Sequence, residues 1–101
     1  MDDLDFDSYM NKVKKIGNST FQYCESLERV IFSETLNYIG YNAFTDCEKL
    51  KEIEFLGKKI EIEDDAFEGC NNVESILVPE GCIGYYRDIL PVEYWPYITE
   101  Y

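Results

Sequence analysis

The chain has 101 residues, of which 46% are hydrophobic and 16% aromatic, so wholesale disorder is excluded and one small domain is expected. Its 21 acidic residues against 9 basic ones give a net charge of -12, which argues against direct nucleic-acid binding because phosphates are recognised by cations. The sequence has no histidine, and this excludes His-based catalytic triads and His metal sites.

The N-terminus is acidic and then carries apolar side chains at helical spacing. Asp3 or Asp5 can act as the N-cap, and a short capping helix is predicted over residues 3–14, in an N-terminal cap at 1–12. This start lacks the basic region of a signal peptide, and no stretch has the roughly 20 apolar residues of a membrane-spanning helix. The chain as it stands is therefore expected in the cytoplasm, or at the cell surface if it is a fragment of a longer protein, and no membrane partner is expected. The apolar positions are Phe6, Tyr9, Met10 and Val13.

Residues 13–79 repeat every 23 residues, without insertion or deletion. Such a short unit cannot bury its apolar side chains alone, but stacked coils hide them in one continuous core. Three repeats are therefore predicted over 13–79. The aligned columns are Ile16, Ile39 and Ile62; Thr20, Ala43 and Ala66; Phe21, Phe44 and Phe67; Cys24, Cys47 and Cys70; Leu27, Leu50 and Val73; Val30, Ile53 and Ile76; and Phe32, Phe55 and Val78.

Each repeat is predicted to contain one strand and one turn. Segments 27–32, 50–55 and 73–78 end in alternating apolar and outward residues, as a strand buried on one side does. These strands are expected to pair in parallel about 4.8 Å apart. The Ala-Phe-x-x-Cys stretch has apolar residues three apart, which predicts a short helical or 3₁₀ turn on the opposite wall. Gly17 and Gly40 predict a tight corner with positive φ.

The outward positions of the three predicted strands form a candidate binding surface. They would lie in a row across one face of the sheet, flanked by Ser33, Leu56 and Pro79. A parallel sheet bare on one face is unusual unless something docks there, and a mixed apolar and charged patch suits protein recognition. The alternative is that these side chains are simply solvated. The candidate residues are Arg29, Ile31, Glu52, Glu54, Leu56, Ser75 and Leu77.

The cysteines and the densest acidic segment offer further chemistry. Cys24, Cys47 and Cys70 should stack within reach of a disulfide, but buried free thiols are the favoured interpretation because zinc needs four converging ligands. Cys82 is expected to fill a leucine position, with a disulfide to Cys70 left open. Residues 61–65 (Glu-x-Glu-Asp-Asp) lack the alternation of a calcium loop and predict a solvated corner. No cofactor or metal is expected.

Residues 80–101 are predicted to form a C-terminal cap. A turn and a short helix, stopped by Pro91, are expected over residues 81–91. The aromatic tail that follows has two interpretations. Its side chains plug the last coil, since termini are ordered when they are tied down, or they form a patch for a partner or a second copy. The tail residues are Tyr94, Trp95, Tyr97, Ile98 and Tyr101.

These columns resemble the BspA-like leucine-rich repeat family, whose unit reads roughly Leu-x-x-Ile-x-Leu-Pro-x-x-Leu-x-x-Ile-Gly-x-x-Ala-Phe-x-x-Cys. The resemblance covers about two thirds of the chain. It departs from the pattern at Thr20 for Ala, at Ser33 and Leu56 for Pro, and at Glu63 for Gly, and none of these substitutions puts a charge into a core column. The second coil carries Leu27, Val30, Phe32, Leu36, Ile39, Gly40, Ala43, Phe44 and Cys47.

The resemblance implies an α/β solenoid, coiled right-handed, with one short parallel strand per repeat, short helical or 3₁₀ turns opposite, and helical caps. It also implies a binding module, often on cell surfaces, and no enzyme. The first functional hypothesis is therefore a non-catalytic module that binds a protein, with a homodimer also plausible. The alternative is a small acidic inhibitor, for example one encoded by a phage, that mimics nucleic acid and blocks a basic groove. An acid-pair hydrolase has no pair of carboxylates singled out by the sequence.

Overall fold

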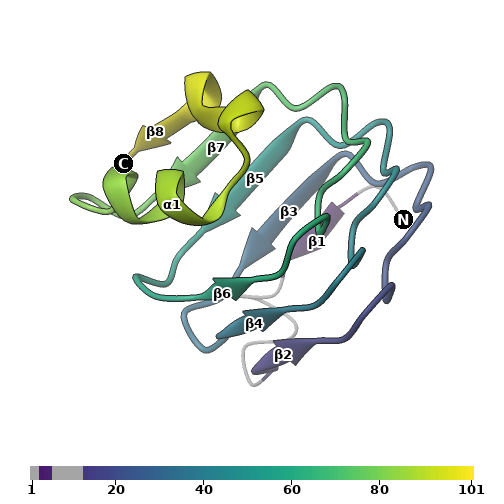
Figure 1. Ribbon diagram of the computed structural model, residues 1–101, viewed down its shortest axis with the longest axis horizontal. Coiled ribbons are helices and arrows are strands. Elements are labelled where there is room, and N and C mark those ends of the chain that lie inside the picture. Colours follow the sequence, from purple (N-terminus) through teal and green to yellow (C-terminus); the bar gives the residue numbers. More distant parts are fainter. Residues whose placement is uncertain (1–2, 6–12) are drawn as a thin grey trace.

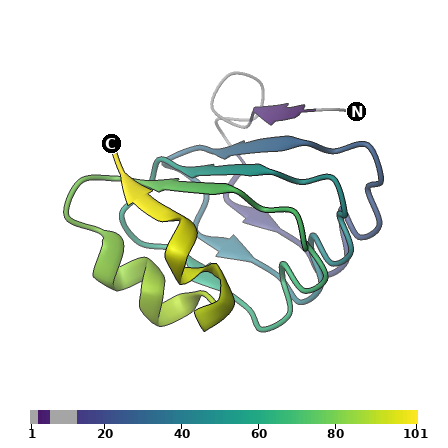
Figure 2. The same ribbon diagram turned by 90° about the horizontal axis from the view of Figure 1, so that it is seen from above.

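The computed structural model describes the backbone of residues 3–5 and all of residues 13–101. The chain winds into stacked coils whose strands form two separate parallel walls (Figures 1 and 2). One wall is a five-stranded sheet in the order β1-β3-β5-β7-β8, and the other is a three-stranded sheet in the order β2-β4-β6. The elements are β1 (Asp3–Asp5), β2 (Lys15–Ile16), β3 (Arg29–Phe32), β4 (Tyr38–Ile39), β5 (Glu52–Phe55), β6 (Glu61–Ile62), β7 (Ser75–Val78), α1 (Ile83–Ile89), the 3₁₀ helix η1 (Val92–Tyr97) and β8 (Ile98–Glu100).

The three predicted strands are present as β3, β5 and β7, each beginning two residues after the predicted start. They pair in parallel with a shift of one whole repeat, so that Val30 lies beside Ile53 and Ile53 beside Ile76. These residues are buried because every second side chain of each strand points into the core. The predicted solenoid architecture and the inward face of its strands are confirmed.

The wall opposite these strands is built from short turns and two-residue strands. In the first coil, Thr20, Gln22 and Cys24 donate backbone N–H groups to carbonyls three residues back, so the predicted short turns are confirmed as a chain of such turns. The two-residue strands β2, β4 and β6 were not predicted. Two columns of residues have positive φ there, which explains the small polar residues at most of these positions. They are Ser19, Asn42 and Asp65, and Tyr23, Asp46 and Gly69.

The corner at Gly40 corrects one sequence prediction. Gly69 and Gly81 are the glycines with positive φ in the described part of the chain, so the positive φ expected at Gly17 and Gly40 was wrong. At Gly40 the requirement is space. A Cβ atom there would lie 2.8 Å from the backbone nitrogen of Asn18 in the preceding coil, closer than side chains tolerate. Glycine therefore allows two successive coils to approach each other at this corner.

The aromatic columns stack through the interior, as the repeat predicted. The ring centroids of Phe21 and Phe44 are 5.2 Å apart, and those of Phe44 and Phe67 are 5.3 Å apart. On the strand side, Phe32 and Phe55 stack at 5.1 Å. These stacked pairs bury large apolar rings and add the favourable interaction of aromatic side chains. Phe44 is fully buried, whereas Phe21 in the first coil is half-buried.

The N-terminal segment differs from its prediction. Asp3–Asp5 is strand β1, which pairs in parallel with β3, so the capping helix expected over residues 3–14 was wrong for these residues. Helical spacing of apolar residues favoured a helix, whereas the free edge of β3 offers backbone partners to any short extended segment. The part of that prediction at 6–12 lies outside the described residues.

The C-terminal segment closes the other end of the solenoid. Helix α1 ends before Pro91, as predicted, and Leu90 is extended because proline restricts the residue before it. The tail then forms η1 and strand β8, which pairs in parallel with β7. Tyr94 and Ile98 are buried, so the plug interpretation holds for them. Other apolar tail residues remain exposed, namely Val92, Trp95, Tyr97 and Tyr101.

Candidate functional site

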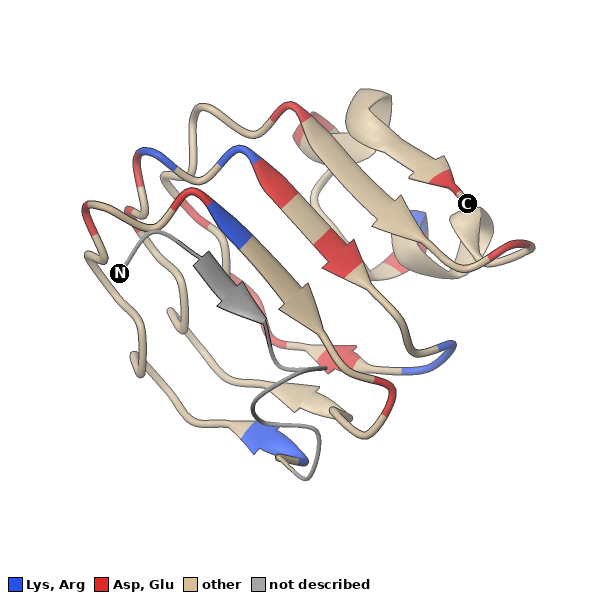
Figure 3. Ribbon diagram, turned by 180° about the vertical axis from the view of Figure 1, so that it is seen from behind, with Lys and Arg blue, Asp and Glu red and all other residues tan. Residues whose placement is uncertain are grey.

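The predicted outward residues lie together on the outer side of the five-stranded sheet, which we call the strand face. Backbone register places them in two rows across three strands. Arg29, Glu52 and Ser75 form one row, and Ile31, Glu54 and Leu77 form the other. Figure 3 shows the basic start of β3 beside the two acidic positions of β5.

The strand face is charged at one side and partly aliphatic along its second row. Arg29 and Glu52 are exposed, whereas Ile31 and Leu77 are half-buried, as is Leu56 just beyond β5. These three aliphatic side chains point outward, as predicted, but each is only partly exposed. Neighbouring strands lie only about 4.8 Å apart, so side chains in one row cover part of each other.

Arg29 forms the ion pairs of this face. Its Nε lies 3.3 Å from Glu52 Oε2, and its Nη2 lies 3.8 Å from Glu54 Oε1. One cation therefore faces two carboxylates, and the centre of the face keeps a net negative charge. Exposed pairs of this kind contribute little to stability, but they orient the three side chains toward the same region of surface.

Tyr101 also reaches the strand face, and the sequence analysis did not place it there. Its hydroxyl donates a hydrogen bond to the Phe55 carbonyl at 2.9 Å and lies 3.3 Å from Glu54 Oε2. The contact depends on β8 lying beside β7, which brings residue 101 close to the end of β5. Strand β8 has one buried residue, Ile98, so its sequence shows no alternation of buried and exposed side chains from which a strand could be predicted.

The cysteines form a ladder of donors in the interior. Cys47 Sγ donates to the Phe21 carbonyl at 3.3 Å, and Cys70 Sγ donates to the Phe44 carbonyl at 3.1 Å. The contact of Cys70 with the Cys47 thiol, and then burial, raises the pKa of Cys70. All four cysteines are free thiols. The burial predicted for Cys47 and Cys70 is confirmed, as is that of the leucine position predicted for Cys82, whereas Cys24 in the first coil is only half-buried.

Tyrosine hydroxyls take over this donor role at the C-terminal end. Tyr94 donates to the Phe67 carbonyl at 2.5 Å, the third member of the column whose first two members accept from thiols. Tyr86 donates to the Gly57 carbonyl and Tyr85 to the Ile60 carbonyl, both at 2.7 Å. The cap thereby satisfies carbonyls that a further coil would otherwise reach.

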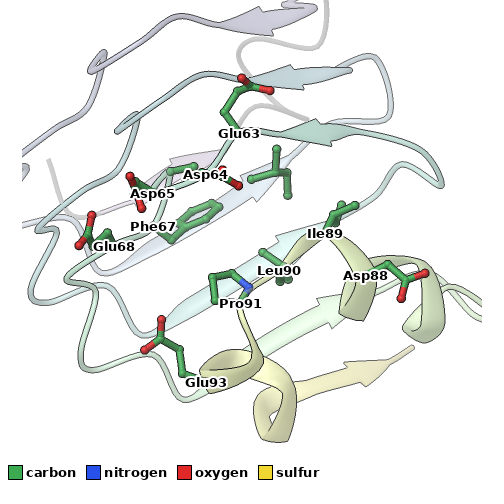
Figure 4. A pocket seen from close by; sticks show the side chains of 12 residues that line it. Glu63, Asp64, Asp65, Phe67, Glu68, Asp88, Ile89, Leu90, Pro91 and Glu93 are labelled. Atoms are coloured by element: carbon green, nitrogen blue, oxygen red, sulfur yellow. The ribbon is translucent and has the colours of Figure 1, made fainter.

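A groove of about 530 Å³ lies between the third coil and the C-terminal cap (Figure 4). Ile62, Phe67, Leu90 and Pro91 contribute apolar surface to it. Three of the carboxylates in the acidic segment 61–65 also line it, so that segment is not only a solvated corner. The groove is lined by six carboxylates in all, those of Glu63, Asp64, Asp65, Glu68, Asp88 and Glu93.

The described residues contain neither a metal-binding cluster nor a membrane-spanning helix. No group of three or more Cys, Asp or Glu side chains in residues 3–5 and 13–101 is arranged to hold a metal ion. No helix in the same ranges is long and apolar enough to cross a membrane. The strand face and the groove remain as the surfaces with distinctive chemistry.

The repeat matches a known protein family. A family model described as the BspA type Leucine rich repeat region matches residues 3–88, with six copies of its unit. No curated protein matches the chain. Leucine-rich repeat modules usually bind proteins, and this family is generally non-catalytic. Because the match covers most of the chain and includes the stacked columns of the core, the protein belongs to the BspA-type leucine-rich repeat family.

Proposed function

We propose that this module binds another protein through its strand face and catalyses no reaction itself. The observation that carries the proposal is the alignment of outward side chains from three adjacent strands on one uncovered face of a parallel sheet. The proposed contact residues are Arg29, Ile31, Glu52, Glu54, Leu56, Ser75 and Leu77.

The chemistry of the face favours a protein partner. Parallel sheets usually have both faces covered, and the outer side of β3, β5 and β7 carries no helix or loop of the described chain (Figure 2). Half-buried Ile31 and Leu77 offer apolar area that a partner can cover completely. Arg29 with its two carboxylates supplies directional charge at the side of this area, and such charge fixes orientation and partner choice.

The test is a pair of matched variants used as bait in the native host. Leu77→Lys places a cation in the aliphatic row, while Val92→Lys makes the same kind of change at an exposed apolar residue on η1. Partners captured by the unchanged protein are identified by cross-linking and mass spectrometry, and their affinities for each variant are then measured. We expect Leu77→Lys to weaken binding at least about tenfold and Val92→Lys to change it less than about twofold.

Two results contradict the proposal. Equal binding by both variants places the interface elsewhere on the molecule. Loss of binding only with Val92→Lys assigns recognition to the exposed aromatic tail. Circular dichroism and urea unfolding of each variant show whether the fold is intact. Sedimentation of the unchanged protein shows whether a second copy is the partner.

The charge supports a second candidate function, a nucleic-acid mimic that blocks a basic groove. The net charge of -12 is the observation in its favour. An interface made by charge weakens steeply as salt rises, because counterions screen exposed charges beyond about 8 Å at 0.15 M. An interface made by the aliphatic row is nearly insensitive to salt. Binding to the captured partner across a salt series therefore separates the two functions.

A further inference from the structure

We infer that the groove between the third coil and the C-terminal cap binds a cationic peptide segment of a partner protein, one that combines Lys or Arg with an aliphatic side chain. The site is distinct from the strand face, since none of the proposed strand-face residues lines it. Its volume of about 530 Å³ falls within the range of ligand pockets.

The shape of the groove comes from two parts of the chain that are far apart in sequence. One side is the turn after β6, which contributes Glu63, Asp64 and Glu68, and the other is the junction of α1 and η1, which contributes Asp88 and Glu93. Figure 4 shows these carboxylates along the two sides, with Phe67, Leu90 and Pro91 between them. A segment lying in the groove would therefore meet apolar surface below and negative charge on both sides.

The charge of the groove selects cations. Its lining contains six carboxylates and no lysine or arginine. Within residues 13–101 the ion pairs within 4.0 Å belong to Arg29, whose partners Glu52 and Glu54 are on the strand face. The groove carboxylates thus form no ion pair within 4.0 Å with a cation of residues 13–101. A partner that supplies cations would relieve their mutual repulsion, which gives the groove charge complementarity to a basic segment.

The spacing of these carboxylates favours a peptide over a metal ion. No three acidic side chains of the described residues converge closely enough to hold a metal. Carboxylates spread along two sides suit several separate ammonium or guanidinium groups, each reaching one or two oxygens. The apolar floor adds a place for an aliphatic side chain between those cations. Phosphate-bearing partners are disfavoured, because six carboxylates repel them.

A cation–π contact occurs on the same wall, between the first and second coils. Lys15 Nζ lies 5.9 Å from the centre of the Tyr38 ring, on neighbouring strands β2 and β4. At the next strand of that sheet, Tyr38 is paired with Glu61, so the position of the lysine is taken by acid as the groove is approached. Along this column of the wall, the side chain therefore changes from the cationic Lys15 through the uncharged Tyr38 to the acidic Glu61 as the third coil is reached.

The experiment uses the full chain and a fluorescein-labelled peptide, Gly-Lys-Arg-Leu-Lys-Leu-Arg-Lys, in an anisotropy titration at about 0.15 M salt, where distant charges are screened. The groove variant combines Asp64→Asn, Glu68→Gln and Glu93→Gln, all at exposed positions. We expect it to weaken binding about tenfold. Replacing both leucines of the peptide with serine is expected to weaken binding by a similar factor, which tests the apolar floor without altering the protein.

A charge-matched control decides the interpretation. Glu25→Gln, Glu48→Gln and Glu74→Gln also change exposed carboxylates, but these lie outside the groove. The proposal requires less than about a twofold effect from this control, together with amide NMR shifts on peptide addition that centre on Phe67 and Leu90. Equal losses in the two triple variants would mean that net charge alone attracts the peptide, and they would overturn the proposal. Absence of binding at about 1 mM peptide would overturn it as well.

Discussion

The five-stranded sheet, which we call the strand wall, lies opposite the wall of turns and two-residue strands, which we call the turn wall. The two walls keep the same 23-residue repeat by different means. On the strand wall the backbone carries the register, because β3, β5 and β7 pair through continuous parallel ladders. On the turn wall, backbone hydrogen bonds also join successive coils, as from the Phe21 N–H to the Ala43 carbonyl, and side chains and left-handed backbone conformations add to them. Positive φ recurs at fixed positions there, and the Cys47 thiol donates to a carbonyl of the preceding coil.

This difference separates the residues that stabilise the fold from those of the proposed binding surface. The outward row of the strand wall reads Arg29, Glu52 and Ser75, three unlike residues, because the backbone ladder holds whatever side chain is present. Fewer residue types fit the turn wall. Its inward positions hold stacked aromatic rings, and its corners need residues that tolerate a left-handed backbone conformation. Sequence variation on the proposed binding surface can therefore accumulate on one wall while the other keeps the coils together.

The largest expected effect is on the turn wall. Phe44→Ala removes a fully buried ring that stacks on both neighbours of its column, and we expect a loss of about 3–5 kcal/mol in the free energy of unfolding. Phe21→Ala at the half-buried first position should cost clearly less. Urea unfolding followed by circular dichroism measures both. Equal losses would mean that the column is not held together by burial.

Alkaline pH should weaken the turn wall and its cap next. Burial raises the pKa of Tyr94 and of Tyr86 above the ordinary 10.0, and the contact with Cys47 raises that of Cys70 above 9.0. The unfolded chain loses these protons first, so the stability they supply is complete below about pH 9 and declines as pH rises further. Each group contributes roughly 1.4 kcal/mol per pH unit above its unfolded pKa.

Urea unfolding at a series of pH values from about 7 to 11 tests this decline. We expect a flat profile up to about pH 8.5 and a fall of a few kcal/mol by pH 11. Cys70→Ala removes the most deeply buried thiol with a raised pKa, so its profile should fall less steeply between about pH 9 and 10. A profile unchanged by Cys70→Ala would contradict the assignment of the early decline to the buried thiol.

A pair of glycine substitutions gives a smaller effect with opposite signs. Gly40→Ala pushes a Cβ atom against the backbone of Asn18, and we expect a loss of about 1–3 kcal/mol. Gly84→Ala lies in α1 with no atom within 4 Å of the added carbon, so it should stabilise by about 0.5–1 kcal/mol. Thermal unfolding of both variants measures the difference. A neutral Gly40→Ala would show that the coils can separate at that corner.

The smallest expected effect is on the strand wall. Arg29→Ala removes two exposed ion pairs, and the free energy of unfolding should change by less than about 0.5 kcal/mol. The same substitution should reduce affinity for the partner of the strand face, measured by calorimetry. A loss of stability above about 2 kcal/mol would mean that this outward row supports the fold, and the separation of the two walls would fail.

The repeated features of the fold were predictable from the sequence, and the features made by single contacts were not. Burial of Phe44 and Ile53 follows from columns that recur at a fixed spacing, because stacked coils must hide matching side chains. The same alternation predicted the outward direction of Glu52. Strand β1 escaped prediction because three residues carry no periodicity, and the edge of β3 decides their conformation.

The candidate surfaces divide in the same way. The strand face came from local alternation, whereas the groove depends on Pro91 and Glu93 folding back onto the third coil, which no local pattern encodes. The position of Tyr101 on the strand face likewise follows from the pairing of β8 with β7. Contacts of this kind are set by the packing of the whole cap.

Tyr94 has a consequence for the length of the molecule. Its hydroxyl occupies the place in the Phe-carbonyl column where a fourth cysteine thiol would donate, so the cap presents to the third coil the same chemistry that another coil would present. An additional 23-residue unit inserted before the cap would then meet a compatible surface on each side. Arrays of this type can grow or shrink by whole units while their terminus is kept unchanged, which makes the extent of the proposed binding surface an adjustable property.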